Sequence, residues 1–235
     1  QQSSSASESL YKMDPDNRLL ARGPRVRLPA EIIRDQALAS SGLLVPKIGG
    51  HSARPYMPDK VWDETSTFGN MLNYKADQGE GLYRRSIYTI WKRTAAPPSM
   101  LLFDAPNREI CMPKRSRTNT PLQALALMNE VTYVEAARAL AEKMLHAKSA
   151  KNSEDRLILG YRLATGSSPN AGTLSILMDG LDKRRKSFSE NPDAAKSLIN
   201  QGSSTPSSDM DEVELAAYTS TANILLNLDR VIMKN

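Results

Sequence analysis

Apolar residues recur every three or four positions over most of the chain, with charged and polar residues between them. This spacing places apolar side chains on one face of an α-helix, whereas a half-buried strand alternates every second residue. The pattern predicts helices over residues 29–41, 82–93, 130–147, 153–165 and 171–189, a short helix from 192, and a last helix from about 211. We therefore expect an all-α fold, with any β-structure confined to short pieces in residues 43–81.

One stretch, residues 117–129, differs because its predicted helix has almost no polar face. Thr120 is a favourable N-cap residue, Pro121 suits the first helical position, and Gln123 completes a capping box. The residues that follow, 124–128, are all apolar. A helix that is apolar all round is normally buried. The sequence therefore predicts an irregular multi-helix domain arranged around this short, buried central helix.

Helical spacing is lost in residues 43–81, where Pro and Gly interrupt a long irregular segment that also carries aromatic residues. Loops of this length inside a compact domain are uncommon and are often functional. Tyr56 and Trp62 in this segment, together with Trp91 beyond it, are candidates for an aromatic binding surface. The alternative is that these side chains and Phe68 pin the irregular segment onto the helices, which makes them part of the core.

Local composition divides the 235-residue chain into a short tail and one domain. Residues 1–9 are polar and Ser-rich, as in tails and linkers. Residues 10–235 are expected to form a single helical domain, which begins with a turn and a short apolar anchor at Leu19 and Leu20. Residues 201–209 are rich in Ser, Gly and Pro, and we expect them to be a mobile loop.

The overall composition is that of an ordinary globular protein, with 40% hydrophobic and 24% charged residues. The net charge of +5 is mild, and Lys and Arg are spread along the chain, so we expect no nucleic-acid partner. No apolar run approaches the roughly 18 residues of a membrane-spanning helix. No signal peptide is visible at Gln1, and because the chain does not open with Met we expect a processed chain or a fragment.

Potential metal and haem ligands are few. Cys111 is the only cysteine, so the chain has no internal disulfide and no haem-attachment motif. His51 and His146 are far apart in the sequence and have no neighbouring carboxylate motif, which disfavours a metal site. The Met residues occur at helical spacing and are typical of a core. We expect no metal and no cofactor in this chain.

Charged residues cluster just before the short apolar helix, and this cluster is the best candidate for a site. It consists of Asp104, Arg108, Glu109, Arg115 and Arg117. Arginines near a helix N-terminus form a plausible anion site. The favoured alternative is structural, with Arg–carboxylate ion pairs that fix this connection in place. A third hypothesis makes Asp104 and Glu109 a glycosidase-like pair, which requires carboxyl groups ~5–10 Å apart.

Several motifs, in the same order, resemble one known family. They are Asp16-Asn-Arg-Leu-Leu, Arg22-Gly-Pro-Arg, Arg34-Asp-Gln-Ala-Leu, Leu82-Tyr-Arg-Arg-Ser, Trp91-Lys-Arg-Thr, Phe103-Asp-Ala-Pro-x-Arg-Glu, Arg117-Thr-Asn-Thr-Pro-Leu-Gln-Ala-Leu, Tyr133-Val-Glu-Ala-Ala and Asn223-x-Leu-Leu-Asn-Leu-Asp. The chain resembles the C-terminal domain of unknown function, family 1553, of large planctomycete and verrucomicrobial multidomain proteins associated with cytochrome-c-like domains. The resemblance implies that this chain is the C-terminal portion of that family domain.

The resemblance also implies a periplasmic or extracellular location and a multidomain, redox-linked assembly in which an upstream domain carries haem. It supplies no catalytic residues. Two classes of function therefore stay open. The first, which we favour, is a non-catalytic helical interaction module that packs against upstream domains of the same polypeptide or other subunits. The second is a carbohydrate-active domain that binds or cleaves a glycan through the aromatic surface and the Asp104–Glu109 region.

Overall fold

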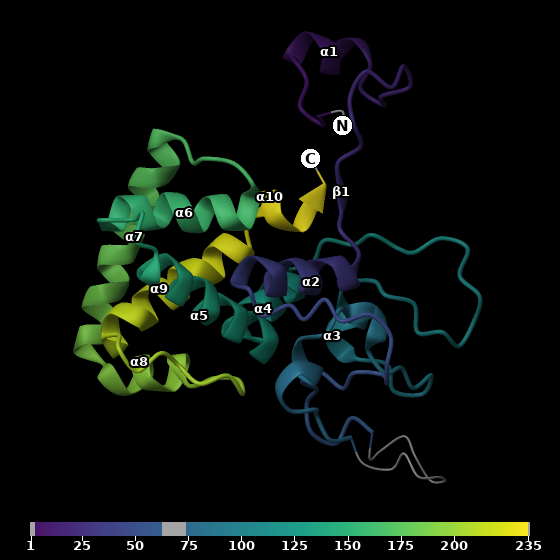
Figure 1. Cartoon of the computed structure of the whole chain (residues 1–235). Helices are drawn as coiled ribbons and strands as arrows, with labels where there is room; N and C mark the ends of the chain where they lie inside the picture. Colours follow the sequence, from purple (N-terminus) through teal and green to yellow (C-terminus); the bar gives the residue numbers. More distant parts are fainter. Residues whose placement is uncertain (1–2, 63–73, 235) are drawn as a thin grey trace.

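The computed structural model describes residues 3–62 and 74–234, and this part of the chain is almost entirely helical (Figure 1). The helices are α1 (Glu8–Met13), α2 (Ala30–Ser41), α3 (Pro98–Leu102), α4 (Pro121–Asn129), α5 (Val131–His146), α6 (Ser153–Thr165), α7 (Ala171–Glu190), α8 (Pro192–Ile199), α9 (Glu212–Leu226) and α10 (Asp229–Ile232). Two 3-10 helices, η2 (Gly79–Tyr83) and η3 (Ser86–Tyr88), and two short strands, β1 (Val26–Arg27) and β2 (Met233–Lys234), complete the described elements. The predicted all-α fold is confirmed, but both described strands lie outside residues 43–81, where short β-structure was expected.

The centre of the molecule is the pair of helices α5 and α9, which pack against each other along their length (Figure 1). Helix α5 buries almost every residue from Thr132 to Ala141, and many of these are alanines. Small side chains let two helices approach closely, so the contact is continuous along both helices. Helix α2 covers α5, while α7 and α8 cover α9. Each of these helices had been predicted from its periodicity.

Helix α4 is not the buried centre, and this part of the prediction is wrong. Gln123 and Leu127 face the core, but Leu122, Leu125 and Met128 are 61%, 56% and 49% exposed. The capping box at its N-terminus is formed as expected. Helix α4 touches α3, α5 and α9 on one side only. An unbroken apolar sequence gives every face of a helix apolar side chains. It does not determine how many of those faces the neighbouring elements bury.

The helix predicted over residues 82–93 is also absent, because a buried arginine and a backbone N–H from another segment bind its carbonyls. Arg34, buried on α2, donates to the carbonyl oxygens of Leu82 and Arg84 at 2.6 and 2.9 Å. The Tyr83 carbonyl accepts from the Val45 N–H at 3.0 Å. These tertiary bonds take the acceptors that a helix would need, so the segment folds as η2 and η3 joined by extended residues.

A buried polar network fastens residues 201–209 to helix α5. The Glu135 carboxylate is fully buried and accepts from the hydroxyls of Tyr56 and Tyr83 at 2.9 and 2.8 Å. It also accepts from the backbone N–H and the hydroxyl of Ser204 at 2.7 and 2.6 Å. Burial first, and the bond to Glu135 second, raise the pKa of the Tyr83 hydroxyl. The predicted loop is thus held to the core by several hydrogen bonds.

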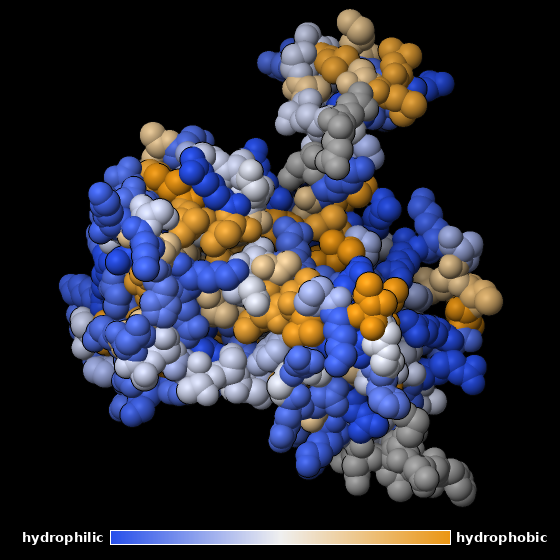
Figure 2. All heavy atoms as spheres, viewed as in Figure 1, coloured by the Kyte–Doolittle hydropathy of each residue, from blue (hydrophilic) through white to orange (hydrophobic). Residues whose placement is uncertain are grey.

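The N-terminal residues form a small lobe that stands apart from the helical body in Figure 1. The Asp14 carboxylate accepts from the backbone N–H groups of Arg18 and Leu19, both at 2.8 Å, and closes the turn that follows α1. Strand β1 leads from this lobe into the body and pairs antiparallel with β2. Leu19 and Leu20, predicted as an anchor, are each 74% exposed, and Figure 2 shows hydrophobic side chains on this lobe.

Candidate functional site

The connection between α3 and α4 carries the predicted charged cluster, and the structure gives each member a different partner. Asp104, in a left-handed backbone conformation with φ of 61°, accepts from the Thr118 backbone N–H at 2.7 Å. It also accepts from the Thr118 hydroxyl at 2.9 and 3.1 Å. No ion pair of Arg117 with Asp104 or Glu109 is found among the described residues, and the Asp104 carboxylate binds Thr118 instead.

Arg115 forms a two-pronged ion pair with Glu31 of α2. Its two terminal nitrogens donate to the two carboxylate oxygens at 2.8 and 3.0 Å. Burial by itself would raise the pKa of the Glu31 carboxyl, but the hydrogen bonds and charge of Arg115 outweigh burial and hold that pKa below its usual value. This ion pair fixes the α3–α4 connection to the first turn of α2, as the hypothesis of structural Arg–carboxylate pairs expects.

Arg108 lies over the ring of Trp91, with its guanidinium carbon 4.5 Å from the ring centroid. The Trp91 indole N–H donates to the Asn107 carbonyl at 3.2 Å, and the Asn107 side chain accepts from the Glu109 backbone N–H at 3.1 Å. Arg108 therefore stacks on an aromatic ring, which is a common arrangement for a guanidinium. Glu109 is exposed and lies outside any cavity lined by Asp104, so the two carboxylates do not face each other across an enclosed site.

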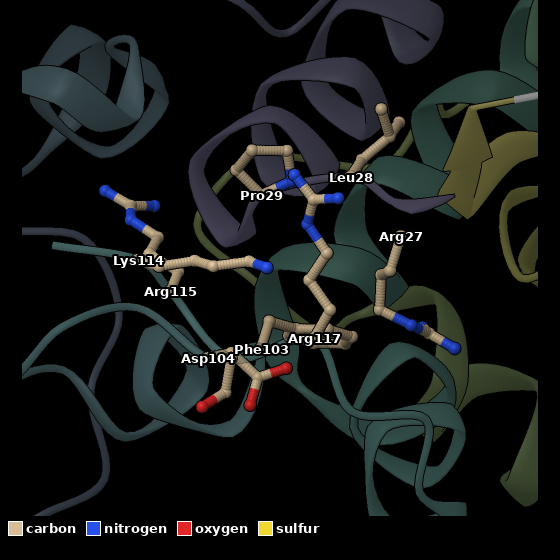
Figure 3. A pocket seen from close by; sticks show the side chains of 9 residues that line it. Arg27, Leu28, Pro29, Phe103, Asp104, Lys114, Arg115 and Arg117 are labelled. Atoms are coloured by element: carbon tan, nitrogen blue, oxygen red, sulfur yellow. The ribbon is translucent and has the colours of Figure 1, made fainter. Parts of the chain in front are cut away.

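Three members of the cluster, Asp104, Arg115 and Arg117, also line a basic pocket of about 180 Å³. The pocket lies between the α3–α4 connection and the start of α2 (Figure 3). The basic pocket is defined by its polar and basic lining residues, which are Arg27, Lys114, Arg115, Ser116 and Arg117. Asp104 is the only acidic lining residue among those described. The apolar walls are Leu28, Pro29 and Phe103. In Figure 3 the Arg117 side chain extends toward Pro29, and the Lys114 side chain extends into the space between Pro29 and Asp104. Neither Lys114 nor Arg117 forms an ion pair within the part of the chain that the structure describes.

Arg27 is the residue of this pocket that the sequence analysis missed. It lies in β1 and is only 8% exposed. One terminal nitrogen donates to the Asn119 side-chain oxygen, while Nε and Nη1 have no hydrogen-bond partner among the described residues. Burial lowers the pKa of the Arg27 guanidinium, and the charges of Asp229 and Asp104 only partly oppose this effect. No local pattern marks Arg27, because its two-residue strand pairs with residues near the C-terminus.

The predicted aromatic surface is not assembled in the described structure. Tyr56 uses its hydroxyl in the Glu135 network, and Trp62 is buried, with its ring edge-on to Tyr74 at 5.0 Å between centroids. Trp91 lines a groove near α2, and Trp62 with Tyr74 lines a separate hollow, so the three predicted residues do not share one surface. The alternative reading, in which these aromatics pack the irregular segment, agrees with the burial of Trp62. Phe68 lies outside the described residues.

The groove beside Trp91 also contains two carboxylates, Glu31 and Asp35. A carbohydrate-cleaving site would need one of them protonated. Glu31 is paired with Arg115, and Asp35 accepts from the Ser86 backbone N–H at 2.7 Å. The oxygens of both carboxylates are thus engaged by donors within the protein. This arrangement gives no support to an acid–base pair.

The histidines and the cysteine do not form a site with the other described residues. No group of three or more His, Cys, Asp or Glu side chains that could hold a metal ion occurs in residues 3–62 and 74–234. His146 lies 3.1 Å from the Asp209 carboxylate at the surface, His51 is exposed, and Cys111 is an exposed free thiol. In the same described ranges, no helix has the length and apolar character required to cross a membrane.

Comparison with known proteins identifies the family. Residues 1–181 match the model of PSD1, a protein of unknown function (DUF1553). This match covers more than half of the chain, so the chain belongs to that family. The matched stretch includes Arg27 and the whole α3–α4 connection, whereas the Asn223–Asp229 motif lies beyond it. No curated protein and no solved structure matches the chain.

Proposed function

We propose that this chain is a non-catalytic interaction module of a larger secreted multidomain protein, and that it docks other domains of that polypeptide through helix α4. The observation that carries the proposal is the stripe formed by Leu122, Leu125 and Met128. These three side chains are about half exposed or more and follow one another at intervals of three residues on a capped helix. Such spacing aligns them along one side of the helix.

Exposed apolar stripes on ordered helices are a common means of helix docking. Gln123 and Leu127 hold the opposite side of α4 in the core, so the stripe is presented on a rigid support. Figure 2 shows hydrophobic side chains reaching the surface elsewhere as well, including the N-terminal lobe with Leu19 and Leu20. The family resemblance supports the choice of companion domains as the partner, a periplasmic or extracellular location, and an assembly that includes haem-bearing domains.

The carboxylates of the candidate sites, in the part of the chain that the structure describes, have structural partners. The carboxylates of Asp104, Glu31 and Asp35 are engaged by backbone N–H groups or Arg115. The buried Glu135 has its acceptors occupied by tyrosine and serine donors and lines none of the described pockets. None of these groups is a free base facing a cavity.

Titration of separately produced companion domains into this chain, followed by calorimetry, tests the proposal. We expect saturable binding that is weakened at least tenfold by the double substitution Leu122→Ser and Leu125→Ser, since removal of two apolar contacts of this size costs about 1.5–3 kcal/mol or more. Ile176→Ser is the matched control, because Ile176 is an exposed apolar residue on α7. Absence of binding, or equal loss in the control, would contradict the proposal.

A further inference from the structure

We propose that the groove beside Trp91 docks an acidic segment of a partner protein, in which a bulky apolar side chain lies next to a carboxylate. The groove lies between α2, η3 and the α3–α4 connection, and none of its lining residues belongs to α4. Docking there is therefore independent of docking through α4. The apolar wall of the groove, an excess of guanidinium groups beside that wall and the volume of the groove support the proposal.

The wall of the groove is formed by apolar side chains from segments that are far apart in the chain. Ile32 on α2 is 43% exposed, and Ile87 on η3 is 71% exposed. Trp91 lines the same groove and is partly buried, with its indole N–H bound to the Asn107 carbonyl. Apolar side chains that gather in one concave place and remain exposed are typical of binding sites. A bulky apolar side chain of a partner would cover this wall.

The groove is preformed because α2 holds η3 in place. Arg34, buried on α2, donates to the Ser86 hydroxyl at 3.1 Å, and Asp35 accepts from the Ser86 backbone N–H at 2.7 Å. Ile87 follows Ser86, so its backbone has a fixed position relative to Ile32 on the same helix. A preformed site avoids the entropy cost of ordering its walls when a ligand binds.

Guanidinium groups outnumber carboxylates at the groove. Its charged lining residues are Glu31, Asp35, Arg85, Arg108 and Arg115. Arg115 is neutralised by Glu31. Asp35 lies 3.9 Å from Arg34 and 3.8 Å from Arg85, so two guanidinium groups share one carboxylate. Arg108 has no ion pair within residues 3–62 and 74–234. The groove therefore favours an acidic segment over a basic one.

Arg108 connects the charged and the apolar parts of the groove. It is exposed, and its guanidinium carbon lies 4.5 Å from the centroid of the Trp91 ring. A guanidinium that stacks on a ring keeps the N–H donors along its edge, and these donors match the two oxygens of a carboxylate. A partner carboxylate bound to Arg108 would place the neighbouring side chain against Trp91 and the isoleucines.

The volume and the opening of the groove indicate a protein segment. The volume is about 440 Å³, within the ~300–1,000 Å³ of typical ligand sites. The high exposure of Ile87 shows that the groove is open to solvent, so a chain can continue beyond the bound side chain. The aliphatic wall suits Leu, Ile or Phe better than a sugar, because sugar hydroxyls would lose their bonds to water there.

Selection from a random heptapeptide phage library on the immobilised whole chain tests the proposal. We expect recovered peptides to be enriched in Asp or Glu next to Leu, Ile, Phe or Trp. The most enriched peptide is then synthesised and titrated by calorimetry. Ile87→Ser should raise its Kd about tenfold or more, since a bulky apolar contact is lost. Arg108→Gln should raise the Kd about threefold or more, since an exposed ion pair is lost.

Two variants serve as matched controls and should bind like the wild type. Ile110→Ser is the control for Ile87→Ser, because Ile110 is also 71% exposed but does not line the groove. Arg93→Gln is the control for Arg108→Gln, because Arg93 is exposed and does not line the groove. Circular dichroism checks that each variant folds, and Ile87→Ser keeps the proposal testable if Arg108→Gln does not.

Three outcomes would overturn the proposal. The first is no enrichment, or enrichment of peptides that lack acidic residues. The second is an equal loss of affinity in the groove variants and their controls. The third is binding that is lost in the double variant Leu122→Ser and Leu125→Ser but kept in Ile87→Ser, which would place the peptide on α4 and leave the proposed function standing.

Discussion

The Asp104 carboxylate accepts from the Thr118 backbone N–H at 2.7 Å, while Arg117, the residue before Thr118, has no acidic partner among the described residues. Asp104 and Arg117 therefore have different roles within the same short connection. Asp104 closes the connection before α4, while Arg117 faces the basic pocket. A cluster that resembles an ion-pair network in the sequence is therefore partly a structural turn and partly a set of free cations.

Asp104→Asn should change the free energy of unfolding by less than about 1 kcal/mol, because the amide oxygen can still accept from Thr118 and Asn tolerates the left-handed conformation that Asp104 adopts. Asp104→Ala should instead lower the free energy of unfolding by about 1–3 kcal/mol, since the Thr118 N–H loses its acceptor. Urea denaturation of the two variants measures the difference. Equal stabilities of Asp104→Asn and Asp104→Ala would show that the bond to Thr118 does not hold this connection.

Leu125→Ala should change the free energy of unfolding by less than about 1 kcal/mol, because the side chain is more than half exposed. Leu140→Ala, at a fully buried position of α5, should cost about 2–5 kcal/mol. Chemical denaturation of the two variants compares them directly. A large loss in Leu125→Ala would mean that α4 is buried after all.

Most of the helical framework could be predicted from the sequence because periodicity and end signals are local. Helix α2 ends where Gly42 takes the left-handed conformation, with φ of 85°, as its position in the pattern suggested. The predictions that failed depend on contacts between residues that are far apart in the chain. Arg34 draws residues 82–84 out of a helix by contacts across 48 or more residues, and the environment of Arg27 depends on β2 near the other end of the chain. No local pattern reports such contacts.

The Arg115–Glu31 pair should contribute a modest stabilisation that disappears in acid. Because the folded-state pKa of Glu31 is lowered, its contribution is present above the unfolded-state pKa of about 4.3 and is lost as the pH falls through the lower folded-state value. Arg115→Gln should cost about 1 kcal/mol or less at neutral pH, since the pair is partly exposed. Unfolding free energies of both proteins at neutral and acid pH test this. A difference that persists below the folded-state pKa would contradict it.

Glu135→Gln should destabilise the domain by about 2–4 kcal/mol, because the amide group presents donors where the carboxylate accepts from Tyr56, Tyr83 and Ser204. Tyr83→Phe removes one donor only and should cost about 1 kcal/mol. Both variants are measured by thermal and urea unfolding. Wild-type stability of Glu135→Gln would show that the network does not hold residues 201–209 to α5.

The central claim, docking of companion domains on α4, is tested most directly by hydrogen–deuterium exchange. Amide exchange in residues 121–129 is compared between this chain alone and the longer polypeptide that contains it with its companion domains. Helix α7, whose Ile176 is exposed in the same way, serves as the internal reference. We predict that exchange in residues 121–129 slows at least tenfold in the longer polypeptide while α7 is unchanged, since docking must be broken before these amides open. Equal exchange rates of α4 in the two proteins would contradict the account.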